Sequence, residues 1–174
     1  MKLYHTSSII IKEPEYDHGR KNADFGQGFY LSPDLDFSYR WAKENSYINI
    51  YELDIEDLDI YTFKKDEEWF EYIYNNRHFK DNLNVDVIIG PIASDTIYDT
   101  LGLFTSDILS KEESLRLFLL GNEYTQVALK TKKAISKLRW LDVLKIEDAS
   151  SYQALRKKEE EGYQRLIAEN IEDE

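Results

Sequence analysis

Apolar positions in this chain fall into short stretches, and polar or charged segments separate them. Stretches with apolar alternation or a buried apolar run predict strands, and the spacing three and four residues apart predicts helices between them. The predicted strands are residues 2–5, 28–32, 48–53, 85–92, 125–131 and 138–146. The predicted helices are residues 33–45, 66–79, 95–103, 110–120 and a helical turn at 131–138. Because strands and short helices mix without a regular alternation, we expect an α+β fold around a curved or split sheet.

Two helix starts are well marked. Ser32 suits an N-cap and Pro33 suits the first helical position, so a helix is predicted to begin there. In the segment "SKEESLRLFLL", Ser110 and Glu113 have the spacing of a capping box. Before the first of these helices, "IIIKEP" predicts a brief extended segment, and residues 15–24 have the composition of a loop.

The pattern changes near residue 146. We therefore divide the chain into a domain at residues 1–145 and a charged C-terminal helix or tail at 146–174. The tail is helix-prone but has sparse apolar positions, namely Tyr152, Leu155, Tyr163, Leu166 and Ile167. It could pack on the domain, bind a partner helix or fray, and its composition favours a solvated helix.

Composition narrows the classes of protein. The chain has 174 residues, no cysteine and a formal net charge of −12. Absence of cysteine excludes disulfides and thiolate metal sites, and the acidic balance disfavours general binding to nucleic acid. No apolar run is long enough to span a bilayer, so we expect a soluble cytoplasmic protein that has no membrane partner.

The common catalytic and metal-binding motifs do not occur. The sequence has no HExxH, Walker A, GxSxG or EF-hand pattern. His5, His18 and His78 have no metal-ligand spacing among themselves, so no metal is expected.

Three stretches stand out when they are considered together. "LYHTS" puts a histidine at the end of a short strand, and "DFGQGFYLSPDLDFSYRWA" combines glycines with aromatic residues. "GNEYTQVALKT" puts polar residues at the start of an apolar strand. The glycines allow either a ligand or a neighbouring backbone to approach closely, and the aromatic residues are either core residues or the two sides of a slot for a flat ring.

Together the three stretches resemble the ADP-ribosyltransferase superfamily, in the branch related to diphtheria toxin and the poly(ADP-ribose) polymerases. That group carries histidine, tyrosine and usually glutamate on three strands of a split sheet, and here His5, Tyr30 and Gln126 are in register. "DFGQGFYLS", "YRWA", "VIIGP" and "TQVALKTKKA" are also similar to motifs of a small bacterial family of unknown function within the superfamily. The resemblance runs from about residue 3 to residue 140 and implies the superfamily's split β-sheet with flanking short helices.

The resemblance implies a site for NAD as substrate. Its cofactor-binding residues would be His5, Thr6, Gly28, Tyr30, Ser38 and Trp41. The glycines and Tyr30 would form a wall for the nicotinamide ring, with Trp41 opposite. The backbone of Thr6 and the hydroxyl of Ser38 would bind the carboxamide, and His5 would bind the adenosine-side ribose.

The implied catalytic residues are His5, Tyr30, Gln126 and Glu123. The third motif position holds an amide, Gln126, where most active relatives have a carboxylate. Glu123 could supply the charge if its strand begins earlier than predicted. If Gln126 replaces a catalytic carboxylate, Gln126→Glu should raise NAD cleavage.

The implied function is mono-ADP-ribosylation of an intracellular macromolecule, either protein or nucleic acid. The resemblance also suggests the toxin of a toxin–antitoxin or phage-defence pair, with an antitoxin protein as partner. The alternatives are a weak or inactive module that binds NAD or ADP-ribose, and a structural domain that binds neither.

Overall fold

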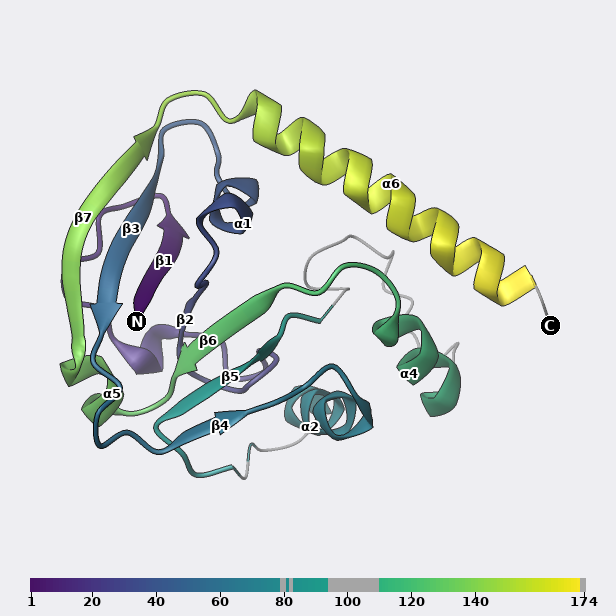
Figure 1. Cartoon of the computed structure of the whole chain (residues 1–174), viewed down its shortest axis with the longest axis horizontal. Coiled ribbons are helices and arrows are strands. Elements are labelled where there is room, and N and C mark those ends of the chain that lie inside the picture. The colour runs from purple at the N-terminus through teal and green to yellow at the C-terminus, as the bar shows by residue number, and fades with distance from the viewer. Residues whose placement is uncertain (79–80, 82, 94–109, 173–174) are drawn as a thin grey trace.

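The computed structural model describes residues 1–78, 81, 83–93 and 110–172. Two β-sheets and five α-helices make up this part of the chain, so the expected mixed α+β class is confirmed (Figure 1). The predicted helix at 95–103 lies outside the described residues.

The first sheet contains three antiparallel strands in the order β1-β3-β7. Their bounds are Lys2–Ser7 for β1, Ser46–Leu53 for β3 and Leu138–Ile146 for β7. Strand β3 therefore begins two residues before its predicted start at residue 48. At this start, the Ser46 side chain accepts a hydrogen bond from the Lys43 N–H and closes the preceding turn. All three strands were predicted from the sequence, and β1 extends two residues beyond its predicted end at residue 5.

The second sheet contains four strands in the order β2-β6-β5-β4. Their bounds are Phe29–Leu31 for β2, Thr125–Leu129 for β6, Val87–Pro91 for β5 and Ile60–Thr62 for β4. The pairs β2–β6 and β5–β6 are antiparallel, and β4–β5 is parallel. The sequence did not predict β4, because three residues are too few to show a period.

The two sheets meet at one short seam. Tyr4 on β1 and Ser32, just after β2, exchange two backbone N–H···O hydrogen bonds of 2.8 Å each. This seam brings the N-terminal strand of one sheet alongside the edge strand of the other (Figure 1). Residues 5 and 30, which are far apart in sequence, become neighbours there.

The helices flank the sheets. Their bounds are Leu35–Arg40 for α1, Glu67–His78 for α2, Lys111–Leu119 for α4, Lys132–Ser136 for α5 and Ser150–Glu172 for α6. A short 3₁₀ turn, η1, at Tyr16–His18 interrupts the predicted loop. Within the described ranges, no helix is both long enough and apolar enough to cross a membrane.

One predicted helix start is confirmed and the other is wrong. The capping box between Ser110 and Glu113 is formed as predicted. Helix α1, however, is capped by Asp34, whose side chain accepts a hydrogen bond from the Phe37 N–H at 3.1 Å. Ser32 cannot be the N-cap because its backbone pairs with Tyr4 in the seam, so the helix begins later and Pro33 precedes it.

The segment "IIIKEP" forms no strand. The buried side chain of Asn49 on β3 holds it instead, since it accepts from the Ile11 N–H at 2.8 Å and donates to the Ile9 carbonyl at 3.1 Å. The Tyr51 hydroxyl also donates to the Ile11 carbonyl, at 2.6 Å. Side chains therefore satisfy the backbone groups that a ladder would have satisfied.

Apolar side chains from both sheets fill the centre of the molecule. One cluster joins Leu3 and Tyr51 of the first sheet to Phe29, Val127 and Leu129 of the second. A second cluster packs α2 and α4 against the second sheet, β2-β6-β5-β4, through Trp69, Phe70, Ile73, Ile88 and Phe118. These clusters hold the two sheets and their helices in fixed positions around the seam.

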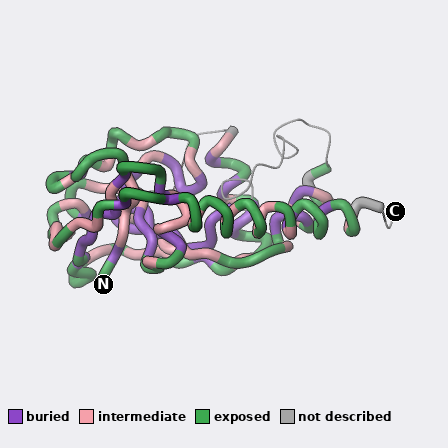
Figure 2. Tube along the Cα trace, turned by 90° about the horizontal axis from the view of Figure 1, so that it is seen from above, coloured by how far each residue is buried: buried purple, intermediate pink, exposed green. Residues whose placement is uncertain are grey.

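Helix α6 extends along one side of the molecule and is exposed over much of its length (Figures 1 and 2). Its buried residues include Tyr163 and Ile167, which are 2% and 5% exposed, and they pack with Leu117 and Phe37. The Tyr163 hydroxyl donates to the Leu117 carbonyl at 3.0 Å. The expectation of a solvated helix is therefore wrong for this face, because Tyr163 and Ile167 lie one turn apart and pack on the domain, whereas Leu155 and Leu166 stay exposed.

We expect Tyr163→Ala to lower the free energy of unfolding by about 3 kcal/mol, because it removes a buried aromatic ring and a buried hydrogen bond. Leu155→Ala on the same helix is the matched control. Leu155 is 56% exposed, so its removal should change stability by less than about 0.5 kcal/mol. Urea unfolding measures both, and equal effects of the two changes would contradict the docking of α6.

Candidate functional site

A cavity of about 440 Å³ opens at the seam between the sheets. Its volume lies within the usual range for small-molecule sites. Two other hollows have similar volumes, but one is lined by α6 alone, whereas the seam cavity receives side chains from both sheets and from α1. The lining residues are Tyr4, His5, Thr6, Arg20, Ala23, Asp24, Tyr30, Leu31, Ser32, Phe37, Ser38, Trp41, Ile92 and Gln126.

The cavity brings together six of the eight residues that the sequence singled out. These are His5, Thr6, Tyr30, Ser38, Trp41 and Gln126. They come from β1, β2, α1 and its C-cap, and β6. The other two residues, Gly28 and Glu123, lie outside the lining.

His5 links β1 to β2 across the seam. Its Nδ1 lies 2.6 Å from the Tyr30 carbonyl oxygen, and its ring lies against Phe29 with centroids 4.6 Å apart. Because a carbonyl oxygen can only accept, Nδ1 carries the proton in this contact.

Burial lowers the pKa of His5 below its ordinary value of 6.5, and the hydrogen bond to Tyr30 opposes this only in part. The neutral ring is therefore favoured near neutral pH, with the proton on Nδ1 and a lone pair on Nε2. Among the described residues, Nε2 has no hydrogen-bond partner. His5 thus offers an acceptor to a ligand hydroxyl group.

The phenol of Tyr30 closes the glycine-rich turn. Its hydroxyl donates to the Gly26 carbonyl at 2.6 Å and accepts from the Phe25 N–H at 3.0 Å. Burial is the main cause that raises the pKa of Tyr30 far above its ordinary value, and the charge of Asp24 adds to it. The hydroxyl therefore stays protonated and structural, while the ring lines the cavity.

The glycines do not form a wall of the cavity, contrary to the expectation from the sequence. A Cβ at Gly28 would lie 2.9 Å from the Leu129 carbonyl oxygen, so this glycine allows the close approach of β6. Gly26 has a φ of +74°, and a Cβ there would meet Asp81 and Lys130. Gly26 is explained by its positive φ and Gly28 by the close approach of the β6 backbone, so a ligand is not needed to explain them.

Helix α1 presents Ser38 and Trp41 to the cavity. Ser38 is 2% exposed, and its hydroxyl donates to the Asp34 carbonyl at 2.7 Å, which leaves the oxygen able to accept. Trp41 contacts Phe37 edge-on, with ring centroids 5.8 Å apart. The guanidinium of Arg156 on α6 lies over the Trp41 ring at 4.9 Å, so α6 contacts the rim of the cavity.

The end of β1 turns backbone groups toward the cavity. The Tyr4 backbone pairs with Ser32, on the side away from β3. Backbone groups two residues apart in an antiparallel ladder point the same way, so the N–H and C=O of Thr6 also face away from β3. The Thr6 hydroxyl donates to the Ser38 carbonyl at 2.7 Å and ties this strand end to α1.

Gln126 and Glu123 occupy different environments. Gln126 lies on β6 and is 7% exposed, and its Nε2 donates to Asp24 Oδ2 at 3.0 Å and to the Pro91 carbonyl at 3.2 Å. Strand β6 begins at Thr125, so Glu123 lies before it, exposed and outside the lining. The carboxylate of Glu123 therefore has no place in this cavity.

Two charged residues of the lining were missed. Asp24, at the start of the glycine-rich stretch, is 4% exposed and forms a salt bridge with Arg77 of α2 at 2.6 Å. An acidic residue directly before an apolar residue and a glycine turn was a usable signal for Asp24. Arg20 lies exposed at the cavity in the loop before β2, and no sequence signal distinguished it from other loop cations.

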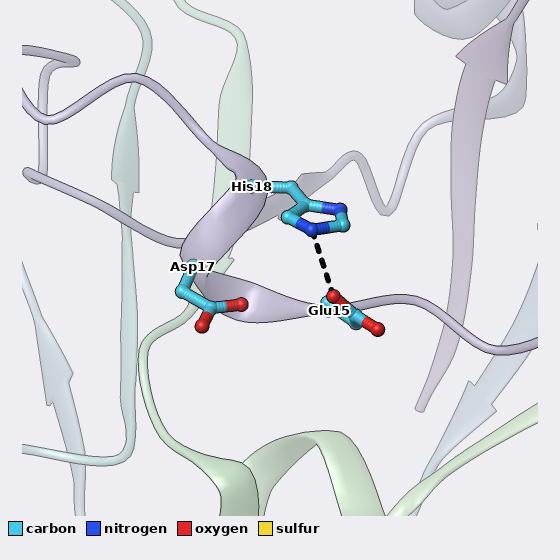
Figure 3. A group of neighbouring side chains, drawn as sticks. All are labelled: Glu15, Asp17 and His18. Atoms are coloured by element: carbon cyan, nitrogen blue, oxygen red, sulfur yellow. Dashed lines mark ion pairs between the residues drawn. The ribbon is translucent and has the colours of Figure 1, made fainter.

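A separate cluster of Glu15, Asp17 and His18 lies on and beside η1 (Figure 3). Their potential ligand atoms all lie within 4.8 Å of one another, but all three residues are exposed and His18 Nε2 already contacts Glu15 at 2.8 Å. Exposed acidic groups often gather without an ion, so this cluster does not by itself indicate a metal site.

The fold and the site define a mixed α+β protein with a cavity of about 440 Å³ at the seam of two sheets. The chain belongs to a family described as a protein of unknown function, DUF3990, whose model matches residues 1–140. No curated protein and no solved structure matches the chain.

The lowered pKa of His5 predicts a pH dependence of stability. The unfolded chain binds a proton at His5 below about pH 6.5 while the folded state resists it, so stability falls as the pH falls through this value. The slope from this residue is at most about 1.4 kcal/mol per pH unit. Urea unfolding at about pH 7.5 and pH 5.5 should show that His5→Gln loses this part of the slope.

His18→Gln is the matched control for this measurement. The side chain of His18 is 79% exposed and does not line the seam cavity, so this change should leave the part of the slope due to His5 in place. An equal slope in wild type and His5→Gln would contradict the burial of His5.

Proposed function

We propose that this protein is an ADP-ribosyltransferase that binds NAD in the seam cavity and cleaves its nicotinamide–ribose bond. The observation that carries the proposal is the meeting of His5, Tyr30 and Gln126 in one cavity of suitable volume. The resemblance of the sequence assigns these three residues to one NAD site. The two sheets joined at a seam are compatible with the superfamily's split sheet.

The nicotinamide end would lie between β1 and α1. Trp41 and the ring of Tyr30 offer flat apolar surfaces with few rotatable bonds, which orient a ring at low entropic cost. The Thr6 backbone offers a donor and an acceptor, and the Ser38 oxygen offers an acceptor. A primary carboxamide needs this combination, because its oxygen accepts and its nitrogen donates.

The rest of the dinucleotide would extend past His5 and Arg20. Nε2 of His5 would accept from a hydroxyl of the adenosine-side ribose, as the resemblance implies. Arg20 is exposed at the cavity and could bind the diphosphate, since guanidinium groups match phosphate oxygens in geometry and charge.

Gln126 would lie beside the ribose that reacts. In the reaction the bond between C1′ and the nicotinamide nitrogen breaks, and its electron pair neutralises the pyridinium nitrogen. An acceptor oxygen or nitrogen then forms a bond to C1′ and releases its proton to solvent. Positive charge develops on the ribose between these events, and an oxygen placed near the 2′-hydroxyl stabilises it.

A second candidate function is a module that binds NAD or ADP-ribose without cleaving it. The amide at position 126 favours this candidate, because a neutral acceptor stabilises positive charge less than a carboxylate does. A macromolecular acceptor, and an antitoxin partner for a toxin, are proposals that depend on the resemblance alone.

Incubation of the protein with labelled NAD and a cell lysate tests the enzyme. We expect nicotinamide release and transfer of label to a macromolecule, both lost in Tyr30→Ala and Gln126→Ala. Tyr30→Phe keeps the ring, so it should retain NAD binding. Saturable binding without release of nicotinamide would favour the binding module. No thermal shift with NAD would contradict both candidates, because a ligand of the folded state must stabilise it.

We expect Trp41→Ala to weaken NAD binding about tenfold or more, because it removes a stacking surface worth roughly 1–3 kcal/mol. Trp140→Ala is the matched control, since Trp140 lies on β7 and does not line the cavity. Isothermal titration measures both variants. Equal affinities of the two would place the nicotinamide elsewhere.

A further inference from the structure

Asp24 lies next to Gln126 and has no role in the site inferred from the sequence. We propose that Asp24 is a positioning residue: its carboxylate orients the Gln126 amide and polarises it, so that Oε1 presents increased negative charge density to the cavity. This inference rests on the proposed function. On this inference the Asp24 carboxylate supplies the negative charge that Gln126, at the third motif position, lacks.

Two acceptors fix the orientation of the amide. Nε2 of Gln126 lies 3.0 Å from Asp24 Oδ2 and 3.2 Å from the Pro91 carbonyl oxygen. Both of these atoms accept only, so the NH₂ group must face them. Oε1 therefore points away from Asp24 and Pro91.

The same amide oxygen is open to the cavity. Among the described residues Oε1 has no hydrogen-bond partner. In that part of the chain the only fully buried side-chain nitrogen or oxygen without a partner is Nε1 of Trp140, so Oε1 is not fully buried. Oε1 consequently retains solvent contact although Gln126 is 7% exposed, and Gln126 lines the cavity. A ligand hydroxyl can donate to it there.

Both carboxylate oxygens of Asp24 already accept hydrogen bonds from protein groups, so we assign Asp24 no direct contact with the reacting atoms. Oδ1 accepts from Arg77 at 2.6 Å, and Oδ2 accepts from the Ala93 N–H at 3.1 Å as well as from Gln126. The Asp24 carbonyl also accepts from Asn76 at 3.2 Å. These contacts hold the carboxylate rigidly, so it affects a bound ribose through the amide.

A carboxylate that accepts from an amide NH₂ draws positive charge onto that group and leaves the carbonyl oxygen more negative. Hydrogen bonds in a buried chain strengthen one another in this way, and charged partners have the larger effect. In the proposed reaction Oε1 would accept from the 2′-hydroxyl of the ribose, where it stabilises positive charge developing at C1′. Nicotinamide still leaves with the electron pair of its bond, and no proton moves through Asp24.

The contact explains why an amide occupies position 126. A glutamate there would place a second carboxylate about 3 Å from Asp24, and two carboxylates this close do not both ionise. On this inference we expect that Gln126→Glu alone does not raise NAD cleavage, unlike the expectation from the sequence. The charge can occupy one of the two positions, and in this chain it occupies position 24.

The test compares Asp24→Asn, Gln126→Glu and the double variant Asp24→Asn/Gln126→Glu. We expect Asp24→Asn to lower kcat for nicotinamide release about tenfold with little change in KM for NAD, because a charge-assisted bond becomes a neutral one. Gln126→Glu should be less stable than wild type and no faster. The double variant moves the charge to position 126 and should recover turnover, which is a non-additive result.

Arg77→Gln is the matched control. It removes the cation that pairs with Asp24 and leaves the bond to Gln126 in place, so it should lower stability while kcat is retained. The same loss of kcat in Arg77→Gln and Asp24→Asn would reveal a merely structural role for Asp24. A double variant no faster than Asp24→Asn would also overturn the proposal.

A measurement without NAD separates this inference from the proposed function. The side-chain NH₂ proton signal of Gln126, identified by its absence in Gln126→Met, should move upfield in Asp24→Asn and stay in place in Arg77→Gln. If wild type cleaves no NAD but the signal moves, the proposed function fails and the polarised amide stands. If wild type cleaves NAD and Asp24→Asn cleaves it equally fast, the role of Asp24 fails and the function stands.

Discussion

The buried carboxylate of Asp24 joins the parts of the structure that surround the cavity. It binds Arg77 of α2, the backbone after β5 at Ala93, and Gln126 of β6. Burying a charge costs free energy unless the charge is paired and hydrogen-bonded, so these partners together make the burial of Asp24 possible. The hydrogen bonds of this one carboxylate thereby fix the loop before β2, the second sheet and α2 relative to one another.

The seam of the two sheets adds the second constraint. Tyr4 and Ser32 hydrogen-bond each other's backbone groups, and the His5 side chain adds a hydrogen bond to the Tyr30 carbonyl. The strands diverge beyond this point, because β1 pairs with β3 while β2 pairs with β6. The cavity forms where they separate, and α1 covers one side of it. Groups from distant parts of the chain thus meet in one partly water-excluded space, where polar contacts are stronger than in water.

Helix α6 contacts α1, the helix that presents side chains to the cavity. Its Tyr163 fits against Gly121, where any Cβ would lie 2.8 Å from the ring, and its Glu159 forms an ion pair with Arg40 of α1. Tyr152 stacks on Tyr39 with ring centroids 4.6 Å apart, so α6 contacts α1 at several levels. Because α1 carries Ser38 and Trp41, the helix beyond the matched family region supports the wall of the cavity.

The sequence by itself determined the α+β class, most of the strands, the capping box at Ser110, and the identity of six cavity residues. The elements follow from local periodicity and capping signals, and the six residues follow from the resemblance of three short stretches to one family. Only the tertiary structure decided that Ser32 joins a seam and leaves the helix cap to Asp34. It likewise decided that the glycines serve neighbouring protein atoms, and that Tyr163 is buried. The role of Asp24 is the clearest case, since its partners are 53, 69 and 102 residues away in sequence. No local pattern specifies such contacts, because the free energy of burying a charge depends on which groups the whole fold brings to it.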